Sequence, residues 1–131
     1  MTMREIEILK ITRNNFIGLV KAMSLEQLNK IPDTHNNNIF WNFAHNVVTQ
    51  QLLCYKLAGA EMRIPQDIVD LYRKGTGPLG DVSQADVDQM IEWAEKTSEW
   101  MEEDFNSGVL TANDYHEYTT CLLYTSDAAD D

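Results

Sequence analysis

Histidine is the residue type in this chain best suited to chemistry near neutral pH, and the chain contains three histidines. His35 lies in an Asn-rich loop and His116 in a polar stretch near the end, so both are expected to be solvated. His45 instead lies on the apolar face of a helical segment, between Trp41 and Val48. An unpaired buried polar group costs about 1–3 kcal/mol. His45 is therefore either a metal ligand or a core histidine with a hydrogen-bond partner.

Spacing alone does not complete a metal or catalytic site around His45. A protein metal site needs about three protein ligands, and no His-x-x-x-His, Cys-x-x-Cys or Glu-x-x-His pattern occurs in the sequence. The glycine-rich segment 74–78 lacks the spacing of a phosphate-binding loop, and no Gly-x-Ser-x-Gly turn is present. The sequence therefore identifies no catalytic residue and no residue that binds an organic cofactor.

The segments that must position His45 are helical. Apolar residues recur every three or four positions in three long segments, residues 3–23, 39–58 and 83–105. In the first of them the predicted apolar stripe comprises Ile6, Leu9, Phe16, Ile17, Leu19, Val20 and Met23. The acidic residues of the third alternate with its apolar stripe, which is typical of a solvated face.

Local signals predict where these helices begin and end. Asn38 is a good N-cap for the second long helix, and Gly59 is a typical stop signal. A capped turn is expected at residues 24–28, and a short helix from Pro65 to about Arg73. No segment shows the alternation of a convincing strand. The sequence therefore predicts an all-α protein, a helical bundle that lacks one helix.

Composition excludes several classes of partner. The 131 residues carry a net charge of −11, which disfavours binding to nucleic acid or to an anionic membrane surface. The sequence has no apolar run of about 18 residues that could span a membrane. The N-terminus lacks the apolar core of a secretory signal, so the expected location is cytoplasmic.

The last eleven residues, 121–131, do not continue the preceding pattern. Cys-Leu-Leu-Tyr-Thr-Ser-Asp-Ala-Ala-Asp-Asp resembles the translation of a transposase-based sequencing adapter, and such segments are excluded from fold reasoning. The alternative is a genuine acidic tail. We expect residues 1–120 to form one incomplete helical domain, and the natural protein to continue past Thr120.

The segment Asn36-Asn-Asn-Ile-Phe-Trp-Asn-Phe-Ala-His45, continuing through Gly59 and on to residues 70–78, resembles the DinB-like superfamily. The resemblance is to its bacterial members, especially those of the Bacteroidetes, and covers most of residues 1–120. It implies a four-helix bundle, often dimeric, in which three histidines hold a divalent metal of the zinc or nickel type. The first ligand of the family falls on His45. The other two usually come from a His-x-x-x-His pair on the last long helix, which this chain lacks.

The resulting hypothesis is a fragment of a DinB-like metal-dependent enzyme of the hydrolase or thiol-transferase type. It acts on an unidentified small molecule, with a homodimer as a possible assembly. The fragment itself is expected to be inactive and not to bind the metal stably. Without the last helix, the face that bears Trp41, His45 and Val48 is expected to be partly exposed. The alternative is a non-catalytic helical bundle that acts through dimerisation or a partner.

Overall fold

A computed structural model of the chain describes residues 3–34, 36–56 and 59–108, and within these ranges it contains helices and no strand. The α-helices are α1 (Met3–Lys21), α2 (Leu25–Asn29), α3 (Ile39–Gln51), α4 (Gln66–Tyr72) and α5 (Gln84–Ser107). A π-helical turn, η1 (Leu52–Lys56), continues α3. The prediction of an all-α fold is confirmed. The predicted tail 121–131 and the polar stretch 109–120 before it lie outside the described residues.

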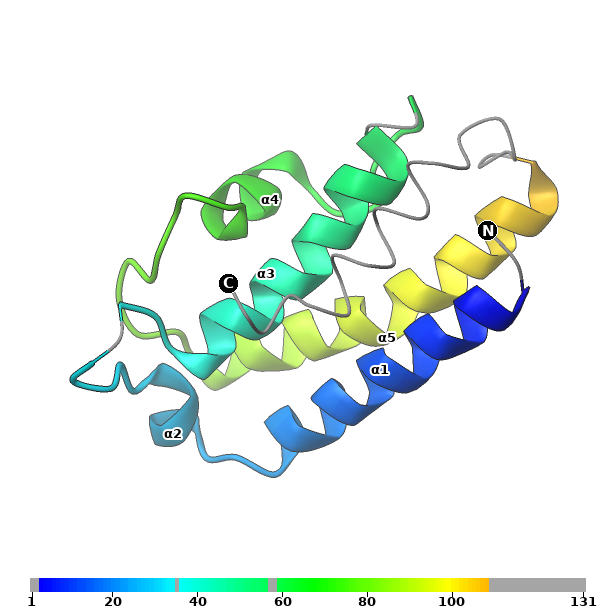
Figure 1. Ribbon diagram of the computed structural model, residues 1–131. Helices are drawn as coiled ribbons and strands as arrows, with labels where there is room; N and C mark the ends of the chain where they lie inside the picture. Colours follow the sequence, from blue (N-terminus) through cyan, green and yellow to red (C-terminus); the bar gives the residue numbers. More distant parts are fainter. Residues whose placement is uncertain (1–2, 35, 57–58, 109–131) are drawn as a thin grey trace.

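Three long helices make the body of the bundle. Helices α1, α3 and α5 lie alongside one another, and α1 runs opposite in direction to α3 and α5 (Figure 1). The short helices α2 and α4 lie toward the end of the bundle at which α3 and α5 begin, and both pack against α3. Helix α3 therefore contacts every other helix and is the element around which the remaining ones are arranged.

The helices begin where side chains satisfy the first backbone N–H groups. The Asn38 side chain accepts a hydrogen bond from the Trp41 backbone N–H at 2.7 Å and so caps α3. Ser24 and Ser83 form capping boxes with Gln27 and Asp86 at the starts of α2 and α5. Each of these caps uses residues three apart in sequence, which explains why the sequence predicts the helix starts closely.

The end of α3 differs from the sequence prediction of one helix over 39–58. The α-helix ends at Gln51, and the next residues form η1, where the Ala60 backbone N–H donates to the Tyr55 carbonyl at 2.8 Å. Gly59 follows with a φ of +79°, a conformation that glycine adopts without strain, as expected of a stop signal. Periodicity did not predict the wider π-helical turn, because a π-turn adds one residue without a sequence signature of its own.

The apolar core consists of two clusters along the long helices. The larger one includes Ile17, Val20, Phe43, Val47 and Met90, and the smaller one is Ile6, Leu9, Cys54, Tyr55 and Met101. Leu19, predicted to lie on the buried stripe, is 57% exposed. Arg13, in contrast, is buried. It lies on the stripe because it is four residues from both Leu9 and Ile17.

The described helices do not include one that is both long and apolar enough to cross a membrane.

Candidate functional site

His45 is buried on α3 and its ring orientation is set by a backbone carbonyl. The imidazole is 1% exposed, and its Nδ1 lies 2.8 Å from the carbonyl oxygen of Tyr72, at the end of α4. A carbonyl oxygen can only accept a hydrogen bond, so Nδ1 carries the proton and donates it. When the imidazole is neutral, this arrangement places the lone pair that can bind a metal on Nε2. The Thr49 hydroxyl lies 3.5 Å from Nδ1, at the limit of hydrogen-bond distance.

Trp41 covers one face of the His45 imidazole. The two rings are stacked, with centroids 4.7 Å apart and planes inclined by 11°. Trp41 is 4% exposed, and its indole Nε1–H is buried and makes no hydrogen bond within the described part of the chain. The indole is thus a buried donor beside the histidine.

The expectation that Trp41, His45 and Val48 would be partly exposed is wrong for the 131-residue chain, because all three are buried. Helix α4 packs against α3 and brings the Tyr72 carbonyl onto His45, while Phe40 makes an edge-on contact with the Tyr72 ring. The sequence predicted the α4 region only as a short helix between loops. It did not predict that this helix supplies the hydrogen-bond partner of the histidine.

His45 fits the role of one metal ligand, and the described residues do not supply a complete site. No group of three or more His, Cys, Asp or Glu side chains close enough to hold an ion occurs in residues 3–34, 36–56 and 59–108. The other histidines, His35 and His116, lie outside these ranges, so their predicted solvation stays a prediction. The His45 tautomer agrees with metal ligation, and it agrees equally with a core histidine.

Arg13 is a buried cation that the sequence analysis missed. Its guanidinium donates to three neutral acceptors on α3 and α5: the Gln50 Oε1 at 2.5 Å, the Thr97 hydroxyl at 2.9 Å and the Ala94 carbonyl at 3.2 Å. No carboxylate faces it among the described residues, and burial lowers the pKa of Arg13 to about 10. The available signal was its position in the apolar stripe of the first helix.

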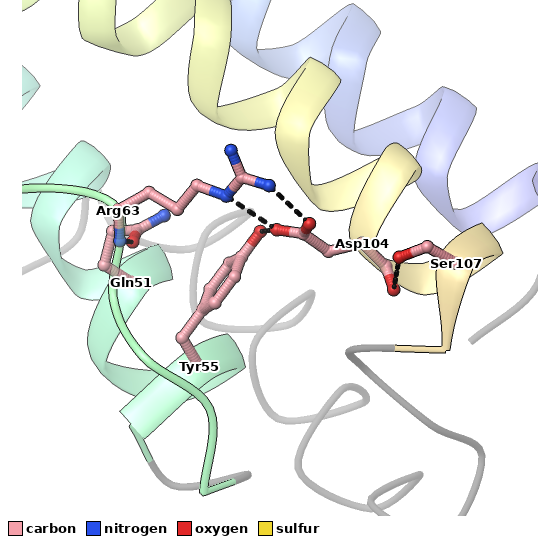
Figure 2. A network of polar contacts seen from close by, with 5 residues as sticks. All are labelled: Gln51, Tyr55, Arg63, Asp104 and Ser107. Atoms are coloured by element: carbon pink, nitrogen blue, oxygen red, sulfur yellow. Dashed lines mark hydrogen bonds and ion pairs between the residues drawn. The ribbon is translucent and has the colours of Figure 1, made fainter.

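A second polar cluster joins α5, η1 and the segment before α4 (Figure 2). The buried Asp104 carboxylate accepts two hydrogen bonds from Arg63, at 2.6 and 3.0 Å, and one from the Tyr55 hydroxyl at 2.5 Å. The Arg63 guanidinium also lies 5.2 Å from the centroid of the Trp100 ring. The hydrogen bonds to Asp104 raise the pKa of Arg63 above its ordinary value.

The Asp104 cluster corrects the sequence interpretation of the third long helix. Its other acids, such as Asp88, Glu92 and Glu99, are exposed as predicted, whereas Asp104 is 3% exposed. Asp104 lies three residues after Met101 and seven after Thr97, so it continues the buried stripe. Its position, rather than its residue type, was the signal that could have identified it.

The sequence of this chain matches a protein-family model. The model of the DinB superfamily matches residues 8–122. No curated protein and no solved structure matches the chain at a significant level. The match includes all of α2 to α5, and therefore His45, Trp41 and the Tyr72 carbonyl.

Proposed function

Since the chain belongs to the DinB superfamily, we propose that it is part of a metal-dependent enzyme in which His45 is one ligand of a divalent metal. The observation that carries this proposal is the 2.8 Å contact between His45 Nδ1 and the Tyr72 carbonyl. Metal-binding histidines usually donate their second ring N–H to a carbonyl or carboxylate, which fixes the tautomer and the orientation of the ring. Nε2 is then the ligating nitrogen.

The surroundings of His45 favour the same role. Stacking on Trp41 restricts rotation of the imidazole, and burial keeps bulk water from the ring. Fixing the ring before the metal binds lowers the entropic cost of binding. A neutral imidazole suits Zn²⁺ or Ni²⁺.

A bound divalent metal supplies a Lewis acid that lowers the pKa of a coordinated water or thiol, which suits hydrolysis or thiol transfer to a small-molecule substrate. In either reaction the Nδ1–H of His45 donates a hydrogen bond to the Tyr72 carbonyl. This bond fixes the orientation of the ring and therefore the direction of Nε2. Trp41 shields one face of the imidazole. The remaining ligands are proposed to come from a His-x-x-x-His pair in a continuation of the natural protein beyond residue 120.

The test is the metal content of the complete natural protein, expressed from the source gene after resequencing across the codon of residue 120. We expect about one zinc or nickel ion per chain, as measured by elemental analysis after dialysis. His45→Ala should lower the metal content at least about tenfold, because one ligand of three is lost. His35→Ala is the matched control and should keep the metal.

A complete protein that binds no divalent metal under any condition tried would overturn this proposal. The non-catalytic bundle would then be favoured, with His45 as a core residue whose Nδ1–H is satisfied by the Tyr72 carbonyl. In that case His45→Ala would lower the free energy of unfolding and change no activity. Resequencing that finds residues 121–131 to be the true end of the gene would count against the proposal in the same way.

A further inference from the structure

The backbone carbonyl that orients His45 is one of the last carbonyls of α4. The last four carbonyls of an α-helix have no N–H partner within the helix, and α4 ends at Tyr72. Two of them have partners outside it. The Tyr72 carbonyl accepts from His45 Nδ1 at 2.8 Å, and the Leu71 carbonyl accepts from the Thr76 hydroxyl at 2.9 Å. The geometry at the end of α4 therefore decides where the acceptor for His45 lies.

A turn in the glycine-rich segment 74–78 brings Thr76 back onto this helix end. The Thr76 backbone N–H donates to the Arg73 carbonyl at 3.2 Å, which closes a turn over residues 73–76. Gly75, the third residue of the turn, has a φ of +93°, and type II turns require a positive φ at this position. A Cβ at Gly75 would meet no atom within 4 Å, so the backbone conformation alone favours glycine there.

The Thr76 hydroxyl contacts the peptide carbonyls on both sides of the Tyr72 carbonyl. It lies 2.9 Å from the Leu71 oxygen and 2.7 Å from the Arg73 oxygen, and its single proton is shared between these two acceptors. Each peptide group is planar, so the backbone turns only at the dihedral angles between neighbouring peptides. Holding the peptides before and after the Tyr72 carbonyl restricts those angles. The hydroxyl therefore limits the direction in which the Tyr72 carbonyl points.

Side-chain packing fixes the ring of Tyr72 and leaves part of its surroundings open. The Phe40 ring meets the Tyr72 ring edge-on, with centroids 5.9 Å apart. A cavity of about 230 Å³ lies between the start of α3, the end of α4 and the segment that leads into α5, and Trp41 and Gly77 also line it. Because part of this boundary is a cavity, packing alone does not fix the backbone after α4. The hydrogen bonds of Thr76 supply that restraint.

We propose that Thr76 is a positioning residue for His45: its hydroxyl holds the Tyr72 carbonyl where that carbonyl accepts the Nδ1–H of the imidazole. Without the hydroxyl the carbonyl can rotate away, and the proton of the neutral imidazole then redistributes between Nδ1 and Nε2. A proton on Nε2 blocks the nitrogen that binds the metal in the proposed function. The role of Thr76 in metal binding rests on that proposed function, whereas its effect on the tautomer does not.

The experiment measures the His45 tautomer from the ¹⁵N chemical shifts of the imidazole in the metal-free 131-residue chain, at mildly alkaline pH. Thr76→Val keeps the shape of the side chain and removes its hydroxyl. It should lower the ratio of the Nδ1–H to the Nε2–H form about two- to fivefold, the effect of one modest hydrogen bond. Thr76→Ser keeps the hydroxyl and should restore the wild-type ratio. Thr12→Val is the matched control, because it removes a hydroxyl from α1 and should leave the ratio unchanged.

A second pair of variants acts through the turn and keeps the test decisive if Thr76→Val does not fold. Gly75→Ala places a side chain at a φ of +93°, which should displace Thr76 and shift the tautomer in the same direction. Gly77→Ala is its control and should change nothing, because the added Cβ would meet Asn37 Oδ1 at 3.6 Å, an ordinary contact. The inference is overturned if the folded variants Thr76→Val and Gly75→Ala keep the wild-type tautomer ratio, or if Thr76→Ser behaves like Thr76→Val.

The complete natural protein separates this inference from the proposed function. If that protein binds metal, Thr76→Val should weaken the affinity about two- to fivefold in competition with a chelator, and Thr76→Ser should not. A natural protein that binds no metal, but whose tautomer ratio falls in Thr76→Val, would overturn the proposed function and keep Thr76 as the residue that positions His45. Metal binding together with an unchanged tautomer ratio in Thr76→Val would do the reverse.

Discussion

The buried polar groups in the two halves of the α3–η1 segment have different kinds of hydrogen-bond partner. In the first half, His45 is oriented by a neutral backbone carbonyl and Trp41 keeps an indole N–H with no acceptor in the described part of the chain. In the second half, Gln50 accepts a hydrogen bond from the buried Arg13, and Tyr55 in η1 donates to the Asp104 carboxylate. The first half lines a cavity. The second half is joined to α1 and α5 by hydrogen bonds that involve the charged groups of Arg13 and Asp104.

This difference separates a region suited to binding from a region suited to holding the helices together. Charge-assisted hydrogen bonds are stronger than neutral ones, and those of Arg13 and Asp104 join elements far apart in the sequence. An unsatisfied buried donor lowers stability, and each half contains one, because Gln51 Nε2 also has no hydrogen-bond partner in the described part of the chain. We therefore expect substitutions in the second half to change stability most, and those in the first half to change ligand binding.

The largest expected effect on stability is that of Asp104→Ala. It removes the acceptor of two Arg63 hydrogen bonds and one from Tyr55. Breaking a buried ion pair costs about 3–5 kcal/mol when the remaining charge stays buried. The Arg63 side chain is 38% exposed and can be rehydrated, so we expect a loss of about 2–3 kcal/mol in the free energy of unfolding, measured by urea denaturation.

Glu103→Ala is the matched control for Asp104→Ala, since it removes an exposed acid at the neighbouring position. Its effect should be within about 0.5 kcal/mol. Equal effects of the two substitutions would contradict the distinction between the two halves, because the Asp104 cluster would then contribute no more stability than an exposed acid.

A smaller effect is expected from Arg13, and it depends on pH. Burial lowers its pKa to about 10, so the folded chain loses this proton before the unfolded chain as pH rises. The unfolded state then binds more protons, and stability from this group increases as pH rises above about 10, until the unfolded chain loses the proton as well. We expect the wild type to gain about 1 kcal/mol relative to Arg13→Met between about pH 9 and pH 11.

Arg13→Met is the reference in this comparison because it keeps most of the side-chain volume and lacks the titrating group. Lysines and tyrosines titrate in both proteins, so their contributions cancel in the difference. Denaturation at both pH values measures it. A difference that stays constant or falls with rising pH would show that burial of the Arg13 charge carries no cost.

The smallest effect is expected from Thr49→Val in the first half of α3. The Thr49 hydroxyl lies 3.5 Å from His45 Nδ1, whereas the Tyr72 carbonyl lies at 2.8 Å. The carbonyl should therefore fix the tautomer alone, and nitrogen chemical shifts should show His45 protonated at Nδ1 in both proteins. A change to the Nε2–H tautomer in Thr49→Val would assign the orienting role to the hydroxyl.

The parts of the fold and site that the sequence predicted correctly depend on neighbours within one helical turn. The caps formed by Ser24 and Asn38 were of this kind, and so was the exposure of most acids on α5. The mistakes concerned residues judged by type rather than by position. Asp104 was assigned to a solvated face although its position continues the buried stripe, and Leu19 was assigned to the core although it lies outside that stripe.

The sequence by itself determined that this chain is helical, where its helices start, and that a histidine lies on the apolar face of α3 next to a tryptophan. Only the tertiary structure decided which groups those side chains meet. The Tyr72 carbonyl is 27 residues from His45, and Arg63 is 41 residues from Asp104. Helical periodicity fixes the face on which a side chain lies, but the packing of one helix against another selects its partner. The cavity beside Trp41 has the same origin, because its walls come from three separate segments of the chain.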